Sequence, residues 1–151
     1  MQNIQVRTTT MADADVIIEC NQLMAMETEN KRLTDEIIAS GVKRLMQKPQ
    51  YGFYLVAENT KKTITGTCMV TMEWSDWRDG LFWWVQSVYV KPEFRKLGVY
   101  TAMYNKIQQL AAKEPDVYGF RLYVEKDNTI AQKTYEKLGM KATDYLLYET
   151  T

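Results

Sequence analysis

The stretch Val88-Tyr89-Val90-Lys91-Pro92-Glu93-Phe94-Arg95-Lys96-Leu97-Gly98-Val99-Tyr100 decides the fold of this chain. It opens with the end of an apolar strand predicted over residues 81–90, which stops before Pro92 because proline cannot donate a ladder hydrogen bond. A glycine follows, and periodic apolar residues predict a helix from about Gly98 to Lys113. Unpaired N–H groups and the positive end of the helix dipole meet at such a helix start. The stretch therefore predicts an anion-binding site.

The loop residues favour the same interpretation. Arg95 and Lys96 can add charge-assisted hydrogen bonds, and Gly98 lets a ligand approach the backbone closely. A glycine before a helix can equally be a tight turn without function, so the loop by itself leaves both interpretations open. The signature GxxxxGK[ST] is missing, as is GxGxxG after the first strand, which disfavours a P-loop and a dinucleotide-binding Rossmann unit.

The surrounding sequence predicts an α/β (α+β) fold with a mixed central sheet flanked by helices. Apolar residues at three- and four-residue steps predict helices, and β-rich runs between polar turns predict strands. A β-α-β-α-β ending implies right-handed crossovers over a partly parallel sheet. The predicted elements are strand 4–7, a helix from Thr10, a helix from about Thr34 to Met46, strands 53–57, 63–72 and 81–90, helix 98–113, strand 117–125, helix 128–138 and strand 141–148.

Composition narrows the possible functions. The 151 residues fit one domain, 1–151. Lys plus Arg and Asp plus Glu both number 19, so there is no electrostatic reason to expect nucleic acid or an anionic membrane as a partner. The chain has no histidine, which excludes a Ser-His-Asp triad, a Cys-His pair and a histidine-ligated metal. Cys20 and Cys68 are far apart in sequence and are expected to be buried, with no metal site and no disulfide.

Targeting signals give a further expectation. The longest apolar run, 81–85, is too short to span a bilayer, and the first residues lack the basic and apolar regions of a signal peptide. We therefore expect a cytoplasmic protein.

The stretch 88–100 resembles the acetyl-CoA motif of the GCN5-related N-acetyltransferase (GNAT) superfamily, whose loop reads Arg/Gln-x-x-Gly-x-Gly/Ala. Arg95 and Gly98 match it, and Tyr100 stands where the family has a small residue. The later run Asn128-x-x-Ala131-x-x-x-Tyr135-x-x-x-Gly139-Met140 is similar to the family's second motif, which ends in Gly-Phe. The order of the predicted elements also matches, so the resemblance covers nearly the whole chain.

The resemblance implies a GNAT fold and an acyltransferase that moves an acetyl group from acetyl-CoA to a primary amine by direct attack in a ternary complex. It implies that Tyr135 protonates the departing thiolate, although a core aromatic residue is the alternative. Asn128 would contact the pantetheine arm or simply cap a helix. The implied cofactor-binding residues are Val88, Tyr89, Val90, Arg95, Lys96, Leu97, Gly98, Val99, Tyr100, Thr101 and Asn128.

The attacking amine must be neutral, whereas a free alkylamine with a pKa near ~10 is mostly protonated at neutral pH. The proton is taken by water or by a carboxylate, since histidine is missing. The candidate carboxylates are Glu27, Glu29, Glu73, Asp76 and Glu125. The acceptor, a small-molecule or peptide amine, is not readable from the sequence.

A dense aromatic cluster precedes the motif. Its members are Trp74, Trp77, Phe82, Trp83 and Trp84. We interpret the cluster as core plus a contact in a possible homodimer, with an acceptor-pocket wall as the alternative. Two other functions remain open: a non-catalytic acyl-CoA-binding or regulatory module on the same fold, and a structural interaction domain built on the tryptophans.

Overall fold

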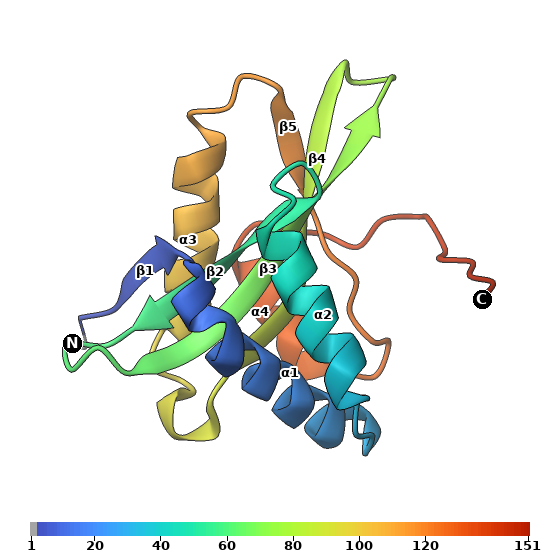
Figure 1. The fold of residues 1–151 in the computed structure, drawn as a ribbon. Coiled ribbons are helices and arrows are strands. Elements are labelled where there is room, and N and C mark those ends of the chain that lie inside the picture. The colour runs from blue at the N-terminus through green and yellow to red at the C-terminus, as the bar shows by residue number, and fades with distance from the viewer. Residues whose placement is uncertain (1–2) are drawn as a thin grey trace.

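The computed structural model describes residues 3–151 and contains a five-stranded sheet flanked by helices (Figure 1). This is the predicted mixed α/β class. No helix within the described residues is long and apolar enough to cross a membrane. The elements are β1 (Gln5–Thr8), the short helix η1 (Met11–Asp13), α1 (Ala14–Glu29), α2 (Asp35–Met46), β2 (Gly52–Glu58), β3 (Ile64–Ser75), β4 (Gly80–Val90), the short helix η2 (Pro92–Phe94), α3 (Val99–Ala111), β5 (Val117–Arg121) and α4 (Thr129–Lys137).

The start of the first helical segment forms as predicted. The carboxylate of Asp13 accepts a hydrogen bond from the backbone N–H of Thr10 at 2.8 Å, which satisfies a donor at the helix entry. The guanidinium of Arg7 binds the same carboxylate through two hydrogen bonds of 2.9 Å. This ion pair ties β1 to the beginning of α1.

The sheet separates two hydrophobic cores. Successive residues of β2 point to opposite faces: Tyr54 and Val56 pack with α1 and α2, whereas Leu55 and Ala57 pack with α3. Figure 1 shows the same arrangement, with α1 and α2 in front of the sheet and α3 behind it. Cys20 and Cys68 are buried and free, as expected.

The sheet has the order β1-β2-β3-β4-β5, with every pair antiparallel except β4 and β5. The predicted strands 53–57 and 63–72 form an antiparallel hairpin as β2 and β3, and the predicted parallel crossover from β4 through α3 to β5 is confirmed. β4 lies between two strands, and its buried residues include Phe82 on one face of the sheet and Trp83 and Val85 on the other, which explains its apolar sequence.

The predicted strand 117–125 is shorter than expected. β5 ends at Arg121, which pairs with Trp84, and the register of β3 and β4 shifts between Thr67 and Met69. Opposite that shift, Ser87 has a left-handed backbone with φ of 49°. A bulge of this kind bends its strand, so the two parallel strands separate beyond Arg121.

The predicted strand 141–148 is wrong. This segment forms no strand, and four of its side chains, Tyr145, Leu146, Leu147 and Tyr148, are exposed. The backbone turns at Gly139, where φ is 89°. Thr143 and Tyr145 then line a cavity with Trp84 and Arg121, and the end of the tail projects from the sheet (Figure 1). A strand needs a neighbouring strand for its hydrogen bonds, and no strand among residues 3–151 pairs with the tail.

Candidate active site

The last residues of β4 have a neighbouring strand on one edge only. From Gln86 to Val90 the strand pairs with β3 on one side, but β5 on the other side reaches only Trp84. Except for the C=O of Val90, which accepts from Arg95 Nε, the backbone N–H and C=O groups of β4 that face this gap are therefore available to an extended ligand carrying amide groups. Val88 and Val90, both predicted site residues, lie in this part of the strand.

The loop that follows opens the helix α3 in a geometry suited to an anion. Gly98 is the N-cap of α3 with φ of 86°, and Lys96 also has a positive φ, 63°, while Leu97 between them does not. Backbone whose φ alternates in sign curls its N–H groups toward one point, which creates an anion-binding concavity.

The first turn of α3 adds further donors to this concavity. The first intrahelical bond is donated by the N–H of Ala102 to the carbonyl of Gly98, so the N–H groups of Val99, Tyr100 and Thr101 precede it. Apart from Gly98 and its two chain neighbours, no residue in the described part of the chain has a heavy atom within 4 Å of the position that a Cβ of Gly98 would occupy, so the space above the loop is open. Backbone donors, a helix dipole and open space thus coincide at the predicted anion site.

The Arg95 side chain is already engaged. One guanidinium nitrogen lies 2.8 Å from Glu27 Oε2 near the end of α1, and Nε donates to the carbonyl of Val90 at 2.9 Å. The hydroxyl of Tyr89 donates to the other oxygen of Glu27 at 2.7 Å. Arg95 and Tyr89 together hold the pKa of the Glu27 carboxyl below its ordinary value. Burial and the bond to Glu27 raise the pKa of Tyr89 to about 12.

Tyr135 belongs to α4. It packs against the start of α3 and lies outside the main core. Its ring centroid is 5.4 Å from that of Tyr100, which in turn stacks on Tyr104 at 6.4 Å. Burial raises the pKa of both Tyr135 and Tyr100, so both phenols carry their proton at neutral pH. The hydroxyl of Tyr100 is buried and has no hydrogen-bond partner among residues 3–151. A buried hydroxyl without a hydrogen-bond partner destabilises the protein, and a ligand atom could provide the missing partner.

Asn128 is the N-cap of α4. Its Oδ1 accepts from the N–H of Ala131 at 3.1 Å, so the capping role predicted for Asn128 is confirmed. No residue of α4 is fully buried, which means that this helix is held to the rest of the chain by partial contacts such as the one between Tyr135 and Tyr100.

The comparisons with known proteins decide the family. A family model described as "Acetyltransferase (GNAT) family" matches residues 18–140. The chain belongs to the GNAT acetyltransferase family. It is 40% identical to a solved structure described as a possible acetyltransferase from Clostridium difficile, which superposes with a TM-score of 0.89 over 98% of this chain and 97% of that one.

More distant GNAT-like structures share the fold alone. An aminoglycoside N-acetyltransferase, AAC(6')-Iy in complex with coenzyme A, is 14% identical and has a TM-score of 0.78, with 100% of this chain and 96% of that one covered. A transcriptional regulator from Bacillus halodurans is 18% identical, with a TM-score of 0.82 and coverage of 99% and 100%. A search of functionally curated proteins found no match.

The candidate carboxylates fall into three groups in this GNAT chain. Glu27 is bound to Arg95, and Glu73 Oε1 lies 2.7 Å from Arg121 while it also accepts from the indole of Trp84 at 3.2 Å. Asp76 lines a cavity of about 460 Å³ beside the tip of the β3–β4 hairpin, and Glu73 lines the same cavity. Glu29 and Glu125 are exposed.

The aromatic cluster divides between core and surface. Phe82 and Trp83 are buried, whereas 57% of Trp74 and 84% of Trp77 are exposed. The two exposed tryptophans line the cavity of about 460 Å³, together with Trp84 and, from the tail, Thr143 and Tyr145. The predicted core role is therefore confirmed for Phe82 and Trp83, while Trp74 and Trp77 face solvent.

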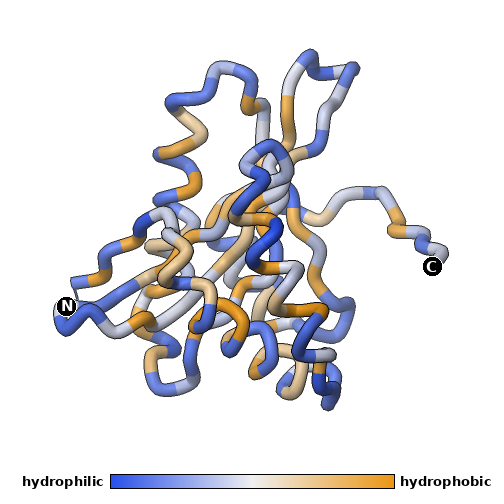
Figure 2. The backbone as a smooth tube through the Cα atoms, in the orientation of Figure 1, coloured by the Kyte–Doolittle hydropathy of each residue, from blue (hydrophilic) through white to orange (hydrophobic). Residues whose placement is uncertain are grey.

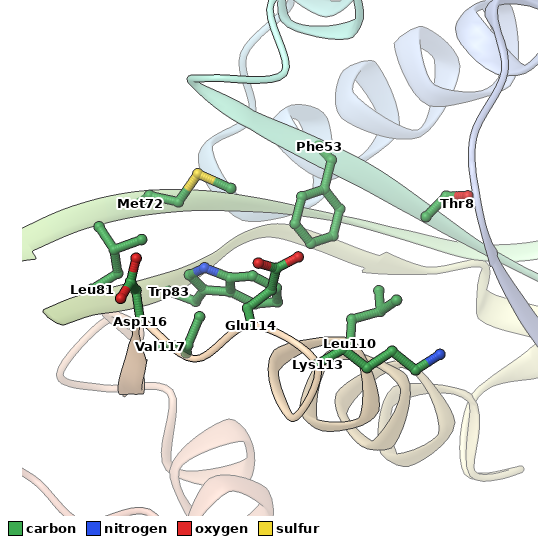
Figure 3. A pocket seen from close by; sticks show the side chains of 10 residues that line it. All are labelled: Thr8, Phe53, Met72, Leu81, Trp83, Leu110, Lys113, Glu114, Asp116 and Val117. Carbon is green, nitrogen blue, oxygen red and sulfur yellow. The ribbon is translucent and has the colours of Figure 1, made fainter.

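A second cavity, of about 380 Å³, lies at the other end of α3 from Gly98 (Figure 3). Figure 3 shows Phe53, Trp83 and Leu110 around it, with Lys113 and Glu114 from the loop after α3. None of the predicted site residues lines it, and it is separate from the anion site.

Two features of the site escaped sequence analysis. The family resemblance implies that the sheet splays around a bulge near Val88 and Val90, but it does not single out Ser87, whose left-handed backbone marks that bulge and which belongs to no turn-like sequence. The pairing of Glu27 with Arg95 joins residues that lie 68 positions apart, and only the fold brings them together.

Proposed function

We propose that this GNAT-family chain is an acetyl-CoA-dependent N-acetyltransferase that moves an acetyl group from coenzyme A to a primary amine. The single observation that carries the proposal is the continuity between the open side of β4 at Gln86–Val90 and the open N-terminus of α3 at Gly98. An extended chain of amides ending in a pyrophosphate has the polar groups that these two surfaces would bind in sequence.

The binding roles follow from the geometry. The N–H groups of Val88 and Val90 and the C=O of Val88 would bind the amides of the pantetheine arm, whereas the C=O of Val90 already accepts from Arg95 Nε. The N–H groups from Leu97 to Thr101 would bind the pyrophosphate, with Lys96 adding a charge. The side chains of Tyr89 and Arg95 would instead fix the path of the loop, because both are hydrogen-bonded to Glu27.

The chemical roles rest on proton transfer. The nitrogen of a neutral amine attacks the carbonyl carbon of the thioester, the carbon–sulfur bond breaks, and the sulfur leaves with the bonding electrons. Tyr135 donates its phenolic proton to that sulfur, and the proton lost by the amine passes through water or a carboxylate and restores the phenol. Because the pKa of Tyr135 is raised, the phenol is still protonated when the sulfur leaves.

The acceptor would approach from the face of the sheet that carries α1 and α2. On this face Trp84, Gln86 and Tyr123 lie near the open side of β4, and the hydroxyl of Tyr123 is 3.4 Å from Gln86 Oε1. We propose a small-molecule or peptide amine as the acceptor. Within this proposal, a cytoplasmic location and a homodimer remain predictions.

The experiment is release of free coenzyme A thiol from acetyl-CoA in the presence of a panel of amines. Turnover above the amine-free rate with at least one acceptor is the expected result. Calorimetry with acetyl-CoA runs in parallel. Binding without turnover for any acceptor would favour the non-catalytic acyl-CoA-binding module, and the lack of any binding would contradict both functions.

A further inference from the structure

The cavity of about 460 Å³ beside the tip of the β3–β4 hairpin has aromatic walls. The indoles of Trp74, Trp77 and Trp84 line it, and the first two are largely exposed. Figure 2 shows the tip of this hairpin mostly in blue and pale tones, because its charged residues are hydrophilic and tryptophan has a mildly polar hydropathy. The apolar surface that the cavity offers to a ligand is therefore mainly aromatic and not aliphatic, which favours a ligand that stacks on rings.

The charged groups of this cavity balance one another. Two acids and two bases line it, namely Glu73, Asp76, Arg78 and Arg121. Arg121 Nη1 lies 2.7 Å from Glu73 Oε1, and the same oxygen accepts a hydrogen bond from the indole of Trp84 at 3.2 Å. Because the formal charges of the lining cancel, a second charged group on a ligand would gain no net attraction here. The cavity is therefore suited to a neutral group.

The wall formed by Trp84 leads from the cavity to the open side of β4. Trp84 pairs with Arg121, where the pairing of β4 with β5 ends. Gln86 lies two residues further along the strand, so it shares the face of Trp84 at a distance of about 7 Å. Tyr123 contacts both residues, since its ring centroid is 5.9 Å from that of Trp84 and its hydroxyl is 3.4 Å from Gln86 Oε1. One continuous surface thus joins the cavity to the proposed place of the thioester.

We propose that the acceptor of this chain is an arylalkylamine, whose aromatic ring occupies the cavity and whose short alkyl chain carries the primary amine past Tyr123 to the thioester. This inference rests on the proposed N-acetyltransferase function and names the class of amine. The ring stacks against the indoles. The amine nitrogen bonds to the acetyl carbon and loses a proton, and coenzyme A leaves as its thiol. The product is an N-acetylated arylalkylamine.

Two other classes of amine fit the same reaction but not the same cavity. The second ammonium group of a diamine would meet as many guanidinium groups as carboxylates, so the cavity would not select it. A saturated ring would cover the indoles but would lack the electrostatic attraction between stacked aromatic rings. The structure therefore predicts an order of preference in which the aromatic amine comes first and the diamine last.

The first test compares three acceptors by the release of free thiol from acetyl-CoA. They are phenethylamine, its saturated analogue cyclohexylethylamine, and the diamine putrescine. We expect kcat/KM to be highest for phenethylamine and at least about tenfold lower for putrescine. A value for putrescine or cyclohexylethylamine equal to that for phenethylamine would overturn the proposal.

The second test locates the ring. A variant carrying Trp74→Ala and Trp77→Ala changes two exposed side chains, so the fold should survive. Its kcat/KM for phenethylamine should fall about tenfold, while the rate with propylamine and the affinity for acetyl-CoA stay the same. Tyr51→Ala is the matched control, because Tyr51 is 59% exposed and does not line the cavity, and it should change none of these values. A parental kcat/KM for phenethylamine in the double tryptophan variant would overturn the assignment of the cavity.

The third test measures binding without turnover. Phenethylamine is titrated by calorimetry into protein saturated with coenzyme A, which carries no acetyl group to transfer. Binding that the double tryptophan variant loses would support the cavity even if no amine is acetylated, and the proposed function alone would then fail. Acetylation of propylamine or putrescine without any preference for phenethylamine would support the acetyltransferase and overturn the arylalkylamine. A lack of phenethylamine binding would also overturn it.

Discussion

The ring of Tyr100 packs against the ring of Tyr135, with 5.4 Å between centroids, so the first turn of α3 contacts α4 through two phenols. Tyr100 stands where the loop of related acetyltransferases has a small residue. Its side chain fills space next to the proposed acid and places a buried, unpartnered hydroxyl there.

Tyr100→Phe should stabilise the unliganded protein. The substitution removes a buried polar atom that has no partner, and such atoms cost about 1–3 kcal/mol. The free energy of unfolding, measured by urea titration, should therefore rise. Tyr89→Phe is the matched control, because the hydroxyl of Tyr89 donates to Glu27 at 2.7 Å and its loss should lower stability. A Tyr100→Phe variant less stable than the parent would mean that its hydroxyl has a partner in solution.

Gly98→Val should weaken acetyl-CoA binding. Valine adds bulk where the backbone must approach pyrophosphate, and it disfavours the φ of 86° that Gly98 adopts. We expect affinity to fall by at least about tenfold, or ~1.4 kcal/mol, by calorimetry. Gly139→Ala shares the strain, with φ of 89°, but lies outside the loop, so it should keep the affinity. Equal affinity in Gly98→Val and the parent would remove the loop from the binding site.

Tyr135→Phe tests the proposed acid. Phenylalanine removes the proton and little volume, so acetyl-CoA affinity should hold while kcat falls about 10²–10⁴-fold for a positioned acid if chemistry is rate-limiting. The checks are steady-state kinetics with a working acceptor and a calorimetric titration of the same preparation. If the variant keeps the parental kcat and chemistry is shown to be rate-limiting, Tyr135 has a packing role only. If the variant loses acetyl-CoA affinity and keeps a normal kcat, Tyr135 is a binding residue.

Glu27→Gln should lower stability at neutral pH but not in acid. The folded-state pKa of Glu27 is depressed by Arg95 and Tyr89, so its stabilisation is fully present above the unfolded pKa of ~4.3 and is lost as pH falls through the folded value. Because the pair is partly exposed, the difference at pH 7 should be at most about 1 kcal/mol.

Arg32→Gln is the control for Glu27→Gln. It breaks the exposed ion pair of Arg32 with Asp35, so its effect should be near zero at every pH. Unfolding curves at pH 7 and pH 3 check both variants. A Glu27→Gln difference that persists unchanged at pH 3 would show that the carboxylate charge is not its cause.

The helices and the antiparallel hairpin were predictable because their signals are local. The apolar steps of α3 and the turn before β3 each lie within a few residues, and a helix or hairpin closes its own hydrogen bonds. The tail illustrates the limit of this reasoning. Its composition predicts a strand over 141–148, but whether a strand forms depends on a neighbour that local sequence cannot specify.

The backbone features of the candidate site could be predicted from the sequence better than the contacts of its side chains. Gly98 and the helix start lie where the motif indicates, and Asn128 caps α4. The sequence placed Arg95 among the ligand contacts, whereas the fold brings it to Glu27, a residue from a different helix. Side-chain partners far apart in sequence depend on how the helices pack against the sheet, and that information is distributed over the whole chain.

The bridge between Glu27 and Arg95 joins the end of α1 to the loop that opens α3. In the proposed enzyme these two segments serve different substrates, the amine on the α1 side and the coenzyme at the loop. Any shift of the loop on coenzyme binding would move the end of α1 as well. Thermodynamic linkage requires that the effect of one substrate on the binding of the other be reciprocal. The expected consequence is cooperative binding of the two substrates, with the coenzyme fixing the geometry that the amine then meets.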